Sequence, residues 1–130
     1  NKLINFMSIN NPYIVLFFAI FTAVISQILF RFGVGNIGEI NLSKSTFPNE
    51  ILKIITSVPI ICGLVFYSFG FLAWMSAMSK LGLSYVYPFT SLNYILVLIF
   101  SWIIFEEPLS LIKWLGILII IIGIFLASRG

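Results

Sequence analysis

Four long runs of apolar residues, separated by short polar stretches, dominate the sequence. A helix needs about 20 apolar residues to cross the hydrocarbon core of a bilayer, and each run reaches about that length. The pattern therefore predicts an all-α membrane protein, a single four-helix transmembrane bundle over residues 1–130. The expected helices cover approximately residues 12–32, 58–79, 84–105 and 109–128, with a loop at 33–57.

The third run, from Gly82 to Glu107, carries polar side chains along one side. They recur at spacings of three, four or seven residues, which places them on one helical face: Ser84, Tyr87, Ser91, Tyr94 and Ser101. Such a face predicts contact with a protein partner or a cavity rather than with lipid. Pro88 lies within this helix, and we expect a kink or loosened turn there because proline lacks an amide donor and clashes with the preceding turn.

The segments between the runs predict how the helices are connected. Glycines and asparagines from Gly33 onward are expected to end the first helix. Thr46 as a cap and Pro48 in a first turn predict the start of another helix. This helix could be a short amphipathic turn at the membrane interface, but we favour a direct lead-in to the second membrane helix. Lys80 to Gly82 leave room only for a tight hairpin.

Small residues repeat at intervals of seven in the second and fourth runs. Gly63, Gly70 and Ala77 form one row, and Gly116 and Gly123 form another. Membrane helices associate closely along rows of small residues, so both rows predict helix-packing surfaces. We expect the first row to support the back of the third helix and the second row to lie at a contact between subunits.

The composition excludes a soluble domain, because 61% of the residues are hydrophobic and only 8% are charged. The net charge of +3 does not indicate nucleic-acid binding, since the cations stand singly at predicted helix ends, where membrane anchors occur. The positions of these cations do not predict how the chain is oriented in the membrane. One side would carry Lys2, Lys80 and Arg129, and the other Arg31, Lys44, Lys53 and Lys113.

The residues needed for most catalytic chemistry are missing. There is no histidine, and the single cysteine, Cys62, lies in a hydrophobic run. We therefore expect no metal site, no cofactor, no intrachain disulfide and no histidine-based catalysis. Glu106 and Glu107 are consecutive, so their side chains point in different directions on a helix. Beside Pro108 they are better explained as charges at the start of the fourth helix, and we do not expect an enzyme.

Two polar residues stand out near the end of the first run. Gln27 and Arg31 are four residues apart and therefore share one helical face. An arginine near the hydrocarbon core costs a few kcal/mol unless its side chain reaches the interface or finds a partner. Arg31 is thus either an interfacial anchor or part of a functional site, and the sequence alone leaves both readings open.

Motifs in the third and fourth runs resemble the drug/metabolite transporter superfamily. They are LSYVYPFTSLN from Leu83 to Asn93, and EPLS from Glu107 to Ser110 with Lys113, Trp114, Gly116 and Gly123. The chain most resembles the four-helix members, which are the subunits of the aminoarabinose-phosphoundecaprenol flippase and, more distantly, the small multidrug resistance transporters. Gln27 and Arg31 resemble the flippase subunits, in which a glutamine is followed four residues later by a basic residue.

One difference separates the chain from the small multidrug transporters. Their first helix carries a central glutamate that binds protons and cationic drugs in turn, whereas the matching position here is Ala23 or a neighbour. The resemblance to the flippase subunits implies translocation of an anionic polyprenyl-phosphate-linked sugar, or a similar lipid, across the cytoplasmic membrane. It implies phosphate binding by Gln27 and Arg31, and substrate contacts from Tyr85, Tyr87, Ser91 and Asn93.

Two other functions stay open. An exporter of hydrophobic or cationic compounds would use an aromatic lining made of Tyr67, Trp74, Tyr85 and Tyr94. A non-transporting subunit would only stabilise another membrane protein. Because four helices enclose little volume, the fold analogy predicts membrane lipids as partners, together with a homodimer or a heterodimer with a related four-helix subunit.

Overall fold

The structure, a computed structural model, describes residues 11–43 and 45–130 as helices joined by short links. Four segments are long and apolar enough to cross a membrane: α2 (Pro12–Ile37), α4 (Val58–Leu81), the kinked segment Leu83–Ile104 and α7 (Leu111–Arg129). The predicted all-α architecture with four spans is therefore confirmed. Lys2 and Lys44, which entered the orientation estimate, lie outside the described residues.

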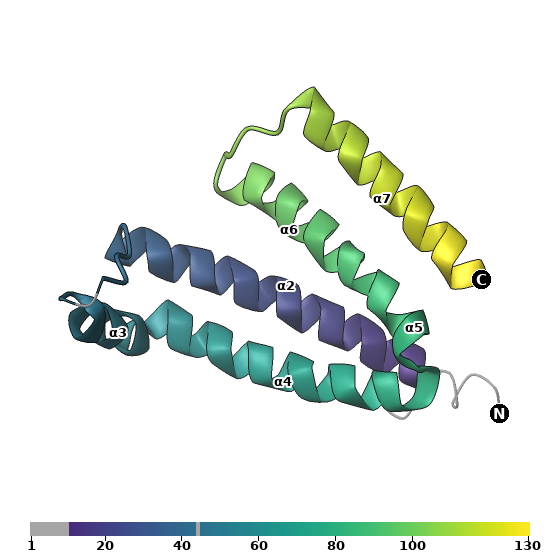
Figure 1. Cartoon of the computed structure of the whole chain (residues 1–130), viewed down its shortest axis with the longest axis horizontal. Helices are drawn as coiled ribbons and strands as arrows, with labels where there is room; N and C mark the ends of the chain where they lie inside the picture. The colour runs from purple at the N-terminus through teal and green to yellow at the C-terminus, as the bar shows by residue number, and fades with distance from the viewer. Residues whose placement is uncertain (1–10, 44) are drawn as a thin grey trace.

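An antiparallel pair of helices, α2 and α4, is the most closely packed pair and forms one side of the molecule (Figure 1). The third span crosses over α2, and α7 lies on the outer side of that span, away from α4. The start of α2 and the end of α7 therefore lie at the same end of the bundle. The buried apolar core lies where α2, α4 and the third span meet, and consists of Leu16, Ile20, Val24, Ala77 and Val86.

The row of small residues on α4 packs against α2. A Cβ added at Gly63 would lie 2.7 Å from the Phe30 ring, and one added at Gly70 would lie 2.6 Å from Thr22 Oγ1. The two helices can approach this closely only because glycine has no side chain. The expected partner of this row, the third helix, is therefore wrong: the row supports α2 instead.

The first span is longer than predicted, because Gly33 does not end it. A Cβ at Gly33 would collide with the side chain of Ile60, so this glycine also serves helix packing. The helix continues to Ile37 and ends at Gly38, whose φ of 90° lies in the region that glycine adopts most readily. The loop expected at 33–57 is correspondingly shorter.

A separate amphipathic helix, α3 (Phe47–Thr56), lies across the end of the α2–α4 pair (Figure 1). The favoured prediction of a direct lead-in to α4 is therefore wrong. Ser57 is extended, and Pro59 in the first turn of α4 cannot donate the hydrogen bond that would continue α3. Glu50 is buried against the bundle, and its Oε1 accepts a bond of 3.3 Å from Lys53 Nζ.

The expected break at Pro88 is confirmed. The third span consists of α5 (Leu83–Val86), a 3₁₀ turn η1 (Tyr87–Phe89) and α6 (Thr90–Ile104). The tight hairpin before it is also confirmed, because Gly82 alone separates α4 from α5 and has a φ of 84°. This geometry brings the start of α6 against the middle of the α2–α4 pair.

The link between α6 and α7 differs from the prediction. Glu106 has a φ of 53°, which is uncommon for a residue with a side chain, and the carbonyl of Ser101 accepts from the Glu107 amide at 3.3 Å. The helix α7 begins only at Leu111, where Ser110 Oγ accepts from the Lys113 amide. A start at Pro108 with two helix-capping acids is therefore wrong, because Ser110 supplies the cap.

The fourth span, like the third, is sparsely covered in the described structure. Only Ile117 of α7 is buried, and Ile112 is 79% exposed. A Cβ at Gly116 or Gly123 would meet nothing within 4 Å, so the second row of small residues faces open space in this single chain.

Candidate functional site

A cavity of about 200 Å³ lies between α2, α4 and the start of α6. Three small or apolar residues of α2 form its floor, aromatic residues of α4 form one wall, and two polar residues of α6 form the other. The lining residues are Ala19, Ile20, Ala23, Tyr67, Gly70, Phe71, Trp74, Thr90 and Asn93. None of these residues is charged, so the cavity is neutral and mainly apolar, with polar groups from Tyr67, Thr90 and Asn93.

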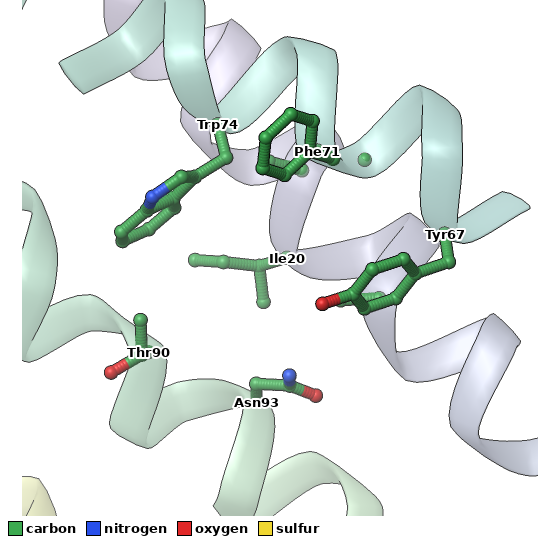
Figure 2. Close-up of a pocket in the computed structure, with 9 residues that line it drawn as sticks. Ile20, Tyr67, Phe71, Trp74, Thr90 and Asn93 are labelled. Atoms are coloured by element: carbon green, nitrogen blue, oxygen red, sulfur yellow. The ribbon is translucent and has the colours of Figure 1, made fainter.

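Asn93 gives the cavity its clearest chemical feature. Its Oδ1 is buried and has no hydrogen-bond partner among the described residues. Figure 2 shows the amide of Asn93 and the hydroxyl of Tyr67 directed towards the same space, on one side of Ile20. Leaving a buried acceptor unpaired costs about 1–3 kcal/mol. Because Oδ1 is fully covered, a ligand group that donates a hydrogen bond can satisfy it once the amide turns towards the cavity.

The hydroxyls of Thr90 and Ser26 are already satisfied by backbone carbonyls of the same chain. Thr90 Oγ1 donates to the Tyr87 carbonyl at 2.6 Å, and Ser26 Oγ donates to the Ala23 carbonyl at 2.7 Å. The aromatic walls of Tyr67 and Trp74 add flat apolar surface. The cavity can thus hold a small group that has both hydroxyl or amino donors and an apolar face.

A row of residues on α2 leads from the cavity towards the charged end of that helix. Ala19 and Ala23 line the cavity, and Gln27 and Arg31 follow at further intervals of four residues. Each interval turns the row by about 40° around the helix, so Arg31 lies about 80° around from Ala23. Ala23 and Arg31 are about 12 Å apart along the axis. The guanidinium of Arg31 lies towards the C-terminal end of α2, because a Cβ added at Gly35 would stand 3.5 Å from Arg31 Nη1. Gln27 is exposed and lies between them.

Arg31 is paired with an acid from the link between α6 and α7. Its Nε donates to Glu107 Oε1 at 3.1 Å, and its guanidinium lies 5.2 Å from the centroid of the Phe105 ring. The two charged side chains are 48% and 45% exposed. Glu107 therefore serves Arg31 and not the start of α7.

The structure brings only some of the predicted substrate-binding residues together. Asn93 lines the cavity, while Gln27 and Arg31 lie one and two turns further along α2. Tyr85 lies at another place, where its ring packs 6.2 Å from Tyr13 and 5.5 Å from Phe89. Tyr87 is 62% exposed, and neither it nor Ser91 is among the lining residues.

Two parts of the site were missed by the sequence analysis. Thr90 lines the cavity although it does not belong to the predicted polar face, and Glu107 reaches Arg31 from 76 residues away. The LSYVYPFTSLN motif contains Thr90, so the motif was a usable signal for it. No spacing rule could have paired Arg31 with Glu107. Tyr67 and Trp74, considered for an aromatic lining, do lie in the cavity.

Four apolar spans, three of which line a neutral cavity, indicate a multi-pass membrane protein of the transporter class. The chain belongs to the EamA-like transporter family, which it matches over residues 11–129.

The most informative relatives are flippase subunits. A probable 4-amino-4-deoxy-L-arabinose-phosphoundecaprenol flippase subunit ArnF of Photorhabdus laumondii is 31% identical over 117 residues, which cover 85% of this chain and 91% of that protein. A probable subunit ArnE of Hamiltonella defensa is 31% identical over 121 residues, or 92% and 98% of the two chains. A probable ArnF of Proteus mirabilis is 29% identical over 109 residues, or 81% and 82%. The solved structures include no match to the chain.

Proposed function

We propose that this chain is a subunit of a flippase for a polyprenyl-phosphate-linked sugar. The sugar binds in the cavity, the phosphate binds near Gln27 and Arg31, and the polyprenyl chain stays in the bilayer. The observation that carries the proposal is the presence, along one helix, of a neutral cavity with an unpaired acceptor and of an arginine two turns further on. The relatives, which are named as subunits of a flippase for such a lipid, support this assignment.

The cavity suits a sugar. Sugar hydroxyl or amino groups supply the hydrogen that Asn93 Oδ1 lacks, and the aromatic rings of Tyr67 and Trp74 suit the apolar face of a sugar ring. Translocation asks for no covalent chemistry, since the site only has to replace the hydration of a polar headgroup while it crosses the membrane. We therefore propose that the chain binds and moves its substrate without changing it.

Arg31 suits the phosphate. A guanidinium always carries its charge, and its planar arrangement of donors matches phosphate oxygens. Gln27 adds amide donors one turn closer to the cavity. The lack of an acid at Ala23 fits the same substrate, because a carboxylate in the cavity would repel an anionic headgroup.

The proposal is tested by reconstituting the purified chain into vesicles, alone and with a related four-helix subunit, and following a fluorescent polyprenyl-phosphate sugar between leaflets. We expect translocation by the wild type and a loss of about tenfold or more for Arg31→Ala, as for removal of a charged hydrogen-bond donor. Arg129→Ala is the matched control, because Arg129 also stacks on a phenylalanine, at 5.5 Å from the Phe125 centroid, but lies at the end of α7.

Two results would contradict the proposal. If neither the chain alone nor the pair of subunits moves the lipid, the flippase assignment fails. If translocation occurs but Arg31→Ala and Arg129→Ala behave alike, the assignment survives and the phosphate-binding role of Arg31 fails.

The functional unit includes a second four-helix subunit in this proposal. The cavity lies on the side of α2 and α4 that α6 covers only in part, while Gly116 and Gly123 on α7 face open space. A partner packed along that row would bury it, as small residues in membrane helices commonly are. Whether the partner is a second copy or a related chain is decided by co-purification of two differently tagged copies.

A small multidrug-type exporter is the second candidate, and the observation that favours it is the presence of Tyr67 and Trp74 in the cavity, since aromatic faces bind organic cations. It predicts drug-stimulated proton flux in liposomes. Transport of the lipid-linked sugar without any dependence on a proton gradient would exclude it.

A further inference from the structure

The pairing of Arg31 with Glu107 changes how the proposed phosphate site has to operate. A phosphate can reach the guanidinium only in competition with a carboxylate of the same chain, which is bound at 3.1 Å. This acid comes from a link 76 residues away, so it is not an incidental neighbour along the same helix.

We propose that Glu107 acts as an internal substitute for the phosphate, occupying Arg31 when no cargo is bound and giving way to the cargo phosphate. The inference rests on the proposed function, and it identifies Glu107 as the residue that sets the affinity of the anion site. The class of ligand is a phosphate ester with at least one negative charge, carried by a lipid.

The contact is suited to displacement. The carboxylate accepts from Nε only, and both side chains are close to half exposed. Exposed ion pairs of this kind contribute little to stability, because water and salt screen them. A phosphodiester carries one negative charge, as a carboxylate does, but it can bind two guanidinium nitrogens at once, whereas Glu107 accepts from one.

The surroundings of Arg31 leave room for such a group. Gly35 lies one turn beyond, and a Cβ at that position would stand 3.5 Å from Arg31 Nη1. The missing side chain keeps that side of the guanidinium open. The Phe105 ring at 5.2 Å fixes the plane of the guanidinium from another side, so its donors stay oriented when Glu107 leaves.

The backbone of the link allows Glu107 to move. Glu106, which follows the end of α6, has a φ of 53°, and the residues from there to Ser110 form no regular structure. Releasing Glu107 would remove an ion pair between α2 and the link that joins α6 to α7. Because α6 carries Asn93 and Thr90 of the cavity, phosphate binding would also loosen the helix that covers the sugar.

The test measures binding of farnesyl monophosphate to the full chain in nanodiscs of zwitterionic lipid. Glu107→Gln should tighten binding by about two- to fivefold, the size expected from removing an exposed ion pair. Glu106→Gln is the matched control, because it removes the same charge one residue away and should leave the affinity within experimental error. In the double variant Arg31→Ala with Glu107→Gln, the gain should disappear.

Inorganic phosphate serves as a second probe. Tightening of both ligands by Glu107→Gln supports competition at a general phosphate site, and tightening of the lipid alone supports a site that also needs the bilayer-bound chain. If Glu107→Gln does not fold, Glu107→Asp tests the same point, since the shorter carboxylate reaches Arg31 less well and should also tighten binding.

The proposal is overturned if Glu107→Gln leaves binding unchanged or weakens it, or if Glu106→Gln tightens it equally. These results are separable from a failure of the proposed function. If Arg31→Ala still lowers binding, only the proposed role of Glu107 is wrong. If Arg31→Ala has no effect either, the phosphate site itself is absent.

Discussion

The cavity and the Arg31–Glu107 pair both lie along α2 but differ in charge, in burial and in whether their polar groups have partners. The cavity lies between three helices, has no charged side chain among its lining residues and contains a buried acceptor without a partner. The ion pair is nearly half exposed, and its partners satisfy each other.

This difference assigns different parts of a cargo to the two places. An unpaired buried acceptor rewards a ligand that donates a hydrogen bond, whereas an exposed pair of charges can exchange one partner for another at little cost. A charged phosphate therefore belongs at the end of α2, and an uncharged sugar hydroxyl or amino group belongs in the cavity.

The largest effect is expected from making the cavity charged. Ala23→Glu places a carboxylate among neutral residues at membrane depth, which costs about 2.5–3.5 kcal/mol on insertion scales and repels an anionic cargo. We expect translocation of the polyprenyl-phosphate sugar to fall about 100-fold or more. Ala23→Gln, with the same shape and no charge, is the control. Equal activity of the two variants would show that the cavity does not hold the headgroup of an anionic lipid.

The next largest effect is expected on stability, from a change in the packing of α4 against α2, the two helices that line most of the cavity. Gly63→Ala forces a Cβ against the Phe30 ring and to 3.1 Å from the Ser26 carbonyl, so we expect a loss of about 1–3 kcal/mol in unfolding free energy in detergent. Gly116→Ala has open space around it and should change stability by less than about 0.5 kcal/mol. If Gly116→Ala lowered the unfolding free energy more than Gly63→Ala, then α7, rather than the α2–α4 pair, would limit the stability of the single chain.

Stability and binding should respond in opposite directions at Asn93. Asn93→Leu removes the unpaired acceptor, so the folded chain should become slightly more stable or stay unchanged, while affinity for the sugar-bearing lipid should fall about five- to thirtyfold. Isothermal titration together with thermal unfolding distinguishes the two effects. A variant that loses stability and affinity together would indicate a structural role for this side chain.

The overall architecture could be predicted from hydrophobicity, because run length alone limits the number of spans. Which side of the third span faces the cavity could not be predicted. The spacing of Ser84, Tyr87 and Ser91 assumes one continuous helix, but a 3₁₀ turn advances about 120° per residue instead of 100°. Three such residues around Pro88 rotate the following helix by about 60°. Thr90 and Asn93 consequently line the cavity, and Tyr87 is exposed.

The sequence also could not predict which residues contact the predicted packing and binding residues. Gly63 and Gly70 could be recognised as packing glycines by their spacing, but a spacing does not state which helix comes close, and the structure places α2 there. Gln27 and Arg31 were found by their shared face. The acid that binds Arg31 follows a left-handed residue in an irregular link, and no periodic pattern extends into such a segment.

The smallest effect is expected at the exposed pair. Arg31→Lys keeps the positive charge but loses the planar set of donors, so binding of farnesyl monophosphate should weaken about two- to fivefold, less than for Arg31→Ala. Chain stability should hardly change, because the pair with Glu107 is exposed. A loss as large as that of Arg31→Ala would show that the guanidinium geometry, and not the charge, determines binding.

The central claim is that the sugar of a lipid-linked substrate enters the cavity, and photocrosslinking tests it most directly. A polyprenyl-phosphate sugar with a diazirine on the sugar ring is illuminated with the full chain in nanodiscs, and the modified peptides are identified by mass spectrometry. The account predicts adducts on Tyr67 to Trp74 of α4 and on Thr90 or Asn93 of α6, which unlabelled lipid suppresses and Ala23→Glu abolishes. Adducts confined to the exposed side of α7, or equal labelling in Ala23→Glu, would contradict it.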